Sequence, residues 1–208
     1  MFGGNFQTWK LHSAQDYFMF FAYILAGVLV FWLIAKYMNK QRNHEKAVEK
    51  VSARLKKICG KPGEVLKNAT LNLPDGEMTF DAVLMDKRGI YLVRTYGWGI
   101  KIYGTPDGAM WRREDAKRKE EFENPLLNLK KGAEEIGKIM EENGVHNLKV
   151  MPMVVFADNY QTPELYLGYG SYSTTYQELK NWYKKQSGVK EVQYDYDKVS
   201  SIIKELAK

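Results

Sequence analysis

The hydrophobic and polar positions divide this chain into one long apolar run near the N-terminus and a longer part of mixed composition. No charged residue occurs from Tyr17 to Ala35, and apolar side chains would cover every face of a helix formed there. A helix of about 20 residues crosses the roughly 30 Å hydrocarbon core of a bilayer. We therefore predict a transmembrane helix over residues 17–38.

A cleaved signal peptide and a buried core helix are the other interpretations of this run. Signal peptides have a basic start, a shorter apolar region and a small-residue cleavage site. Here only Lys10 precedes the run and no Ala-x-Ala-like site follows it. A run of this length that is apolar on all faces also favours lipid over a protein core. Both observations favour a membrane anchor.

The orientation of the anchor follows from the basic residues on its two sides. Before the run there is only Lys10, whereas eight basic residues follow it within about 20 positions. These residues are Lys36, Lys40, Arg42, Lys46, Lys50, Arg54, Lys56 and Lys57. Because basic flanks stay on the cytoplasmic side, we predict an extracytoplasmic N-terminus over residues 1–16 and a cytoplasmic domain over residues 39–208. The basic stretch could also contact anionic headgroups.

The domain after the anchor begins with a helical pattern and continues with strand patterns. Apolar positions from His44 to Ile58 recur at helical spacing, within a basic juxtamembrane helix over residues 39–58. Short β-rich runs separated by turn residues then predict strands. Their ranges are 65–71, 78–85, 90–95, 99–103 and 109–112. A charged loop is expected over residues 113–121.

The remainder of the chain alternates helical and strand patterns. Asn124-Pro125 opens a helix that ends at Asn143-Gly144, and residues 149–157 form a mostly apolar strand of the kind buried on both faces. Thr175 and Glu178 form a capping box for a helix to about residue 187, and a last helix covers residues 195–208. This order of elements predicts an α/β domain with a mixed sheet flanked by helices.

Composition excludes several classes of function. The chain has 208 residues, a net charge of +6, one cysteine and three histidines. A single cysteine allows no intrachain disulfide, and no histidine stands at a zinc-ligand spacing from it. The stretch from Gly60 to Gly63 lacks the spacing of a phosphate-binding loop, and no nucleophile motif is present. We expect no bound metal and no cofactor.

The segment from His44 to about Glu178 resembles the nuclease-related domain (NERD) family, which has the PD-(D/E)xK, restriction-endonuclease-like nuclease fold. The resemblance rests on an ordered set of short motifs rather than on one signature. The motifs are Glu45-x-x-Val48, Phe80-Asp81, the run Gly89 to Val93, the run Gly99 to Gly104, Trp111, Asn124-Pro125-Leu126 and Val154-Val155-Phe156.

The resemblance implies a site at which an aspartate and a glutamate on neighbouring strands hold a divalent ion, with a lysine two residues after the glutamate. Asp81 matches the aspartate, and Glu45 matches a glutamate on the first helix. The expected Glu-x-Lys is replaced by Arg94-Thr95-Tyr96. Arginine is not a metal ligand, and tyrosine has a reference pKa near 10 and does not supply the charge of lysine. We therefore interpret Glu45, Asp81, Arg94 and Tyr96 as a vestigial nuclease site with no catalytic residues.

The hairpin around Lys87 and Arg88 allows a geometric prediction. Antiparallel partners across this turn have residue numbers that sum to 175, so Asp81 should lie opposite Arg94. The guanidinium would then occupy the position of the cation and pair with the carboxylate. Migration of the metal-binding carboxylates to Glu77 or Asp86 remains the alternative, although both lie at turns, where acidic residues are normally solvated.

Two clusters of basic residues are candidate phosphate contacts. They consist of Lys40 and Arg42, and of Arg112, Arg113, Lys117, Arg118 and Lys119. Acidic neighbours such as Glu114 and Glu120 offset most of the charge of the second cluster. Tyr166, Tyr169 and Tyr172 are interpreted as strand-packing residues rather than as a platform for base stacking.

These inferences predict a single-pass membrane protein whose inactive NERD-like domain binds nucleic acid or another membrane or cytoplasmic protein. Its partners are thus the lipid bilayer and one of these macromolecules. One alternative is a membrane-tethered nuclease that uses Mg²⁺ or Mn²⁺ at migrated ligands. Another is a structural subunit of a membrane complex that assembles through small residues of the anchor, namely Ala22, Ala26 and Gly27.

Overall fold

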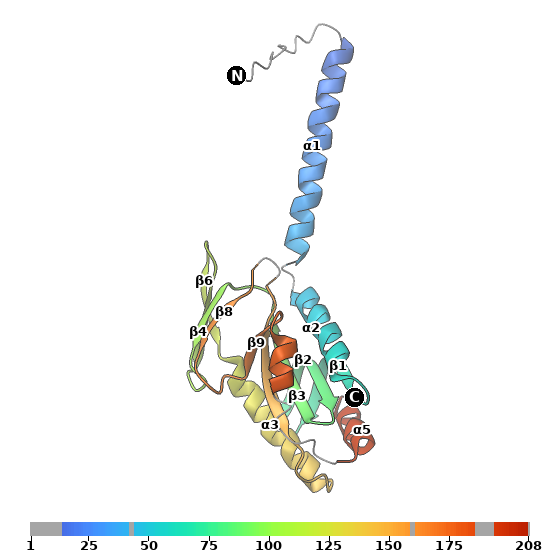
Figure 1. Cartoon of the computed structure of the whole chain (residues 1–208), viewed down its shortest axis with the longest axis vertical. Coiled ribbons are helices and arrows are strands. Elements are labelled where there is room, and N and C mark those ends of the chain that lie inside the picture. Colours follow the sequence, from blue (N-terminus) through green and yellow to red (C-terminus); the bar gives the residue numbers. More distant parts are fainter. Residues whose placement is uncertain (1–13, 42–43, 159–160, 186–193, 208) are drawn as a thin grey trace. The chain divides into compact units, whose positions relative to one another are not determined.

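The computed structural model describes residues 14–41, 44–158, 161–185 and 194–207 and is drawn in Figure 1. The chain divides into two units, Met1–Lys40 and Gln41–Lys208. Most of the predicted N-terminal segment 1–16 lies outside the described residues.

The first unit contains the helix α1 (Ala14–Gln41). Its apolar stretch, Ala14–Lys36, covers 23 residues, none of which is buried in the protein. Length and composition allow this helix to cross a membrane once, and a signal sequence near the N-terminus would meet the same criteria. The helix predicted over residues 17–38 is confirmed as a helix, with additional turns at both ends.

The second unit opens with α2 (His44–Cys59), which confirms the helix predicted to end at Ile58. Residues 42 and 43, over which a continuous helix was predicted, lie outside the described residues. The inward face of α2 carries Ala47, Val51 and Leu55, which are fully buried. The helix ends before Gly60, whose φ of 67° is a left-handed conformation that glycine adopts without strain.

A mixed sheet forms the centre of the second unit. In the described residues its five strands lie in the order β1-β2-β3-β7-β9. The strands are β1 (Glu64–Leu73), β2 (Gly76–Asp86), β3 (Gly89–Tyr96), β7 (Val150–Phe156) and β9 (Ser173–Thr175). The first three pair antiparallel through hairpins, whereas β7 is parallel to both β3 and β9.

Helices cover both faces of this central sheet. Apolar residues of α2 and α4 (Leu179–Lys185) form one core with Ala82, Leu84 and Tyr91. The other core contains residues of α3 (Pro125–Glu142) and α5 (Tyr196–Leu206). Burial on both faces explains why β3 and β7 are almost wholly apolar in sequence. The predicted α/β class, with helices flanking a mixed sheet, is confirmed.

A second sheet lies at the edge of the domain, at the left of Figure 1. Among the described residues it has four strands in the order β6-β5-β4-β8. They are β4 (Lys101–Gly104), β5 (Met110–Glu114), β6 (Lys119–Glu123) and β8 (Glu164–Leu167). Its inner face contributes Ile102 and Trp111 to the core that α3 and α5 cover.

Three local predictions were wrong. Residues 113–121 are not a loop, because β5 and β6 form an antiparallel hairpin across them. Thr175 ends a strand, so α4 begins only at Leu179, although Thr175 Oγ1 still accepts the Glu178 N–H at 3.2 Å. Tyr169 and Tyr172 are exposed rather than packed between strands, whereas Tyr166, although exposed, stacks on Tyr103 of the neighbouring strand. The predicted end of α4 near residue 187 lies outside the described residues.

Candidate nuclease-type site

Asp81 lies at an irregularity in the central sheet. Residues two apart on a regular strand face the same side, yet Phe80 packs in the core beneath α3 and Ala82 in the core beneath α2. On β1 the facing position is Asn68, whose φ of 50° is unusual for a residue other than glycine. The alternation of side chains between the two faces of the sheet is therefore interrupted at Asp81 on β2 and at Asn68 on β1.

The carboxylate of Asp81 is buried and contacts three groups. Its Oδ2 accepts the backbone N–H of Thr95 at 2.5 Å, just beyond the last backbone pair of β2 with β3, Ala82 with Val93. Its Oδ1 lies 3.5 Å from Nη1 of Arg94 and 3.4 Å from Nε2 of His44. The second terminal nitrogen of Arg94 donates to the Thr79 carbonyl at 2.9 Å. Both carboxylate oxygens therefore have partners from the protein itself.

The register predicted for the hairpin is confirmed. Ala82 pairs with Val93 and Asp86 with Gly89, so the residue numbers of partners sum to 175. Continued by one residue, this register brings Arg94 opposite Asp81, and their side chains form the predicted ion pair.

The other two residues of the predicted site lie elsewhere. Glu45 is exposed near the start of α2, and its neighbour His44 makes the described contact with Asp81. The ring of Tyr96 stacks on Phe156 with centroids 5.5 Å apart and also packs against Phe122. Burial raises the pKa of the Tyr96 phenol, so it stays neutral and acts as a core residue. The position of His44 carries no sequence signal beyond its proximity to Glu45.

The two carboxylates considered as migrated ligands are far apart in the fold. Glu77 is exposed and lines a hollow of about 280 Å³ together with Arg94 and Asn128. Asp86, at the end of β2, is buried, unlike most turn acids. It accepts hydrogen bonds from the Tyr183 hydroxyl and, at 2.9 Å, from the Arg88 N–H.

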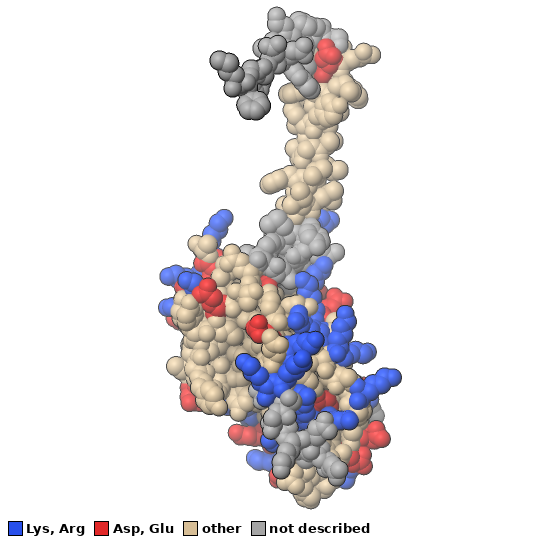
Figure 2. Space-filling view, in the orientation of Figure 1, with Lys and Arg blue, Asp and Glu red and all other residues tan. Residues whose placement is uncertain are grey.

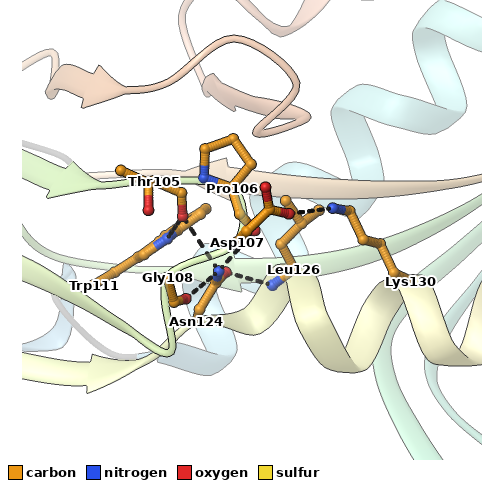
Figure 3. A network of polar contacts seen from close by, with 8 residues as sticks. All are labelled: Thr105, Pro106, Asp107, Gly108, Trp111, Asn124, Leu126 and Lys130. Atoms are coloured by element: carbon orange, nitrogen blue, oxygen red, sulfur yellow. Dashed lines mark hydrogen bonds and ion pairs between the residues drawn. The ribbon is translucent and has the colours of Figure 1, made fainter.

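Asn124 is the centre of a second polar cluster, shown in Figure 3. Its amide nitrogen donates to the carbonyls of Pro106 and Gly108 at 3.1 and 2.7 Å. Its side-chain oxygen accepts the Leu126 N–H at 3.0 Å, which caps α3, and Pro125 follows at the first helical position. One amide thus joins the turn between β4 and β5 to the start of α3.

Trp111 packs against the same turn. Its indole N–H donates to the Thr105 carbonyl at 2.8 Å (Figure 3). A Cβ at Gly104 would overlap the indole, so this position requires glycine. Trp111, Gly104 and Asn124 are therefore structural residues that fix the second sheet to α3.

The family model of the nuclease-related domain matches residues 40–157, which cover more than half of the chain. The protein belongs to the NERD family. Comparison with curated proteins and with solved structures finds no match.

The donor set at Asp81 of this NERD domain does not fit the divalent ion that the family fold implies. Mg²⁺ and Mn²⁺ take oxygen ligands, from carboxylates, carbonyls, water and substrate phosphates, and positively charged neighbours disfavour them. Asp81 instead has a guanidinium and an imidazole as its side-chain neighbours. Among the described residues, no group of three or more His, Cys, Asp or Glu side chains is placed to hold a metal ion.

The basic residues predicted to contact phosphate on the second sheet lie beside acidic ones. Arg113 pairs with Glu120 at 3.0 Å, and Lys119 lies 3.7 Å from Glu114. Arg118 pairs with Asp115 at 3.2 Å. Hydrogen bonds from the backbone N–H of Lys117 and then from Arg118 lower the pKa of the Asp115 carboxyl. The guanidinium groups of Arg113 and Arg118 also lie against the Trp98 ring, at 4.0 and 4.4 Å from its centroid.

The remaining candidate phosphate contacts are less constrained. Arg112 lies 4.0 Å from Glu114 and over the Tyr103 ring, and Lys117 is exposed. Arg42 and the side chain of Lys40 lie outside the described residues. The basic residues of this hairpin are thus set in a field of mixed charge rather than in a continuous positive track.

Proposed function

We propose that this protein is a single-pass membrane protein whose cytoplasmic NERD domain, residues 39–208, binds a macromolecular partner without cleaving nucleic acid. The N-terminal residues 1–16 lie outside the cell and residues 17–38 cross the membrane. The partner is a nucleic acid or a protein.

The observation that carries the proposal is the pairing of Asp81 with Arg94. Cleavage by a nuclease of this type needs a cation held between carboxylates, which polarises the phosphate and activates water. Arg94 lies 3.5 Å from Oδ1 of Asp81, where it supplies a fixed positive charge and repels a metal ion. Tyr96 is packed in the core and supplies no lysine-like charge. The domain thus has the nuclease-related fold, but its site lacks the second carboxylate and the lysine that cleavage would need.

The anchor is supported by the exposure of α1 and by the distribution of charge. Large apolar side chains from Tyr17 to Ile34 are exposed in the protein alone, and lipid would cover them. Basic residues dominate the stretch directly after the apolar run, residues 36–57, which favours a cytoplasmic C-terminal domain.

An exposed row of side chains on the second sheet supports a binding role. Tyr166 and Tyr103 stack with centroids 4.9 Å apart, and the Arg112 guanidinium lies 4.8 Å from the centre of the Tyr103 ring. Tyrosine and arginine are enriched in protein interfaces. Glu121 on β6 lies opposite Arg112 in the register of the two strands, so this surface has mixed charge and favours a protein over a phosphate backbone.

A metal-dependent nuclease with migrated ligands is the second candidate function. Glu77 favours it, because this carboxylate shares a hollow with Arg94 on the edge of the Asp81 site. The third candidate is a structural subunit assembled through α1, where the small residues Ala22, Ala26 and Gly27 would allow close helix packing.

A cleavage and binding assay on the full-length protein in neutral detergent tests the proposal. Labelled single- and double-stranded DNA and RNA are incubated with Mg²⁺, Mn²⁺ or EDTA across a salt series. We expect intact substrates under all conditions. Cleavage that EDTA and Asp81→Ala both abolish would establish the nuclease alternative. Salt-dependent binding without cleavage would identify nucleic acid as the partner, and its absence would direct the search to proteins.

A further inference from the structure

A hollow lined by basic side chains lies between α2 and α4, on the face of the domain shown in Figure 2. It has a volume of about 630 Å³. Six of its ten lining residues are basic and none is acidic. The basic ones are Lys50, Arg54, Lys57, Arg88, Lys180 and Lys184. In the view of Figure 2, Lys and Arg side chains gather over these two helices.

The hollow is separate from the Asp81 site. Asp81 contacts His44, the first residue of α2, whereas Arg54 and Lys57 lie about 15 Å or more further along the same helix, at 1.5 Å per residue. Arg88 belongs to the turn that follows the last residue of β2, Asp86, whereas Asp81 lies in the middle of that strand.

Two arginines in the hollow are held in fixed positions. The Arg54 guanidinium lies 4.6 Å from the centre of the Tyr176 ring and donates to the Gln177 carbonyl at 3.2 Å. Arg88 lies 4.2 Å from the Tyr183 ring centre and donates to the Tyr183 carbonyl at 2.9 Å. Each guanidinium has five N–H groups, so most of its donors remain for a ligand.

The buried Asp86 fixes this arrangement from below. It accepts hydrogen bonds from the Tyr183 hydroxyl and from the Arg88 N–H, and it does not line the hollow. Asp86 thus holds the Tyr183 ring and the backbone of Arg88 in the positions that place the Arg88 guanidinium over that ring.

Basic residues also follow one another at one-turn spacing on both helices of the hollow. Lys50 and Arg54 are four residues apart on α2, and Lys180 and Lys184 are four apart on α4. Like charges at this spacing repel each other along a helix. An anion in the hollow would reverse the sign of this effect.

The shape of the hollow distinguishes a compact anion from a nucleic-acid strand. The basic residues converge on one cavity from two helices and a turn, whereas a strand needs an extended track of positive charge. Cavities of roughly 300–1,000 Å³ are typical of sites for small ligands. Arginine forks bind phosphate through paired hydrogen bonds, and lysines add point charges.

We propose that this hollow, which we name the α2–α4 basic pocket, binds a compact ligand carrying at least two phosphate groups. The ligand is either a soluble polyphosphate compound or the headgroup of a membrane lipid with more than one phosphate. The proposal is independent of whether Asp81 supports cleavage.

The test is calorimetric titration of the full-length protein in neutral detergent with inorganic tripolyphosphate. We expect saturable binding with one site per chain. Lys57→Gln combined with Lys180→Gln removes one exposed lysine from each side of the pocket and should weaken binding about tenfold or more. Arg54→Lys keeps the charge but loses the fork, and should also weaken binding.

A matched control removes the same number of exposed lysines elsewhere, through Lys67→Gln and Lys138→Gln. It should leave the affinity unchanged. Absence of binding, or equal weakening in the control and the pocket variants, would overturn the proposal. So would an equal affinity for tripolyphosphate in the unaltered protein and the Lys57→Gln, Lys180→Gln variant.

Nanodiscs distinguish the two sources of phosphate. The protein is placed in discs with cardiolipin, whose headgroup has two phosphates, or in discs with twice as much phosphatidylglycerol, which match the charge. If the ligand is a lipid headgroup, tripolyphosphate binds more weakly in the cardiolipin discs alone. If the ligand is soluble, both discs give the same affinity. The cleavage assay is unaffected by either result, so the two proposals fail separately.

Discussion

Arg94 changes what Asp81 can do, because the family pattern expects a carboxylate where this guanidinium lies. Two facing carboxylates repel each other unless a cation lies between them. Here the cation is part of the chain, 3.5 Å from Asp81 Oδ1, and the Thr95 N–H holds the other oxygen at 2.5 Å. We propose that the change from acid to base at this position replaces a metal site with an internal ion pair.

Substitutions at Arg94 test this account. Arg94→Gln should lower the free energy of unfolding by about 1 kcal/mol, because the pair is partly exposed and Asp81 keeps the Thr95 N–H. Arg94→Glu should destabilise the protein more than Gln does in EDTA, and Mn²⁺ should restore part of the loss by binding both carboxylates. Thermal unfolding with and without Mn²⁺ measures both effects. Equal stability of the Gln and Glu variants, with no response to Mn²⁺, would contradict the account.

At the scale of elements, the second sheet depends on the cluster around Asn124. One side chain caps α3 and also binds carbonyls of the turn between β4 and β5. Trp111 is fixed to the same turn through the Thr105 carbonyl. Three motif residues of the resemblance to the family, Gly104, Trp111 and Asn124, are thus explained by folding rather than by chemistry.

Two substitutions separate the functions of Asn124. Asn124→Ala should lower the free energy of unfolding by about 2–3 kcal/mol, because both the helix cap and the amide donor are lost. Asn124→Asp keeps a good cap but points oxygen at the turn carbonyls, so it should destabilise the protein at least as much. Urea unfolding measures both. A stability of Asn124→Asp close to that of the unaltered protein would show that the cap alone matters.

At the scale of the whole molecule, the sequence predicts local features better than distant ones. The register of Asp81 and Arg94 follows from the turn of a single hairpin, and the start of α3 follows from Asn124 and Pro125. The strand β6 escaped prediction because four of its five residues, Lys119–Glu123, are charged and obscure the strand pattern. Asp86 meets Tyr183, which is 97 positions away, so neither its burial nor the α2–α4 basic pocket has a local signal.

The orientation of the anchor is testable with the one cysteine of the chain. Cys59 ends α2 and should react with a membrane-impermeant maleimide only after cells are permeabilised. Burial is the main cause that raises the pKa of its thiol, so labelling should be slow at neutral pH and faster as the pH rises. In a Ser13→Cys variant the added cysteine should react in intact cells. Labelling of Cys59 in intact cells would reverse the proposed topology.

The most direct test of the central claim is a titration of the full-length protein in neutral detergent with Mn²⁺, followed by electron paramagnetic resonance. Asp81→Ala serves as the control. Because Arg94 and Thr95 satisfy the Asp81 carboxylate, we predict that the two proteins bind Mn²⁺ alike, with no saturable site that depends on Asp81. A saturable site in the unaltered protein that Asp81→Ala removes would contradict the account and identify a metal-dependent NERD protein.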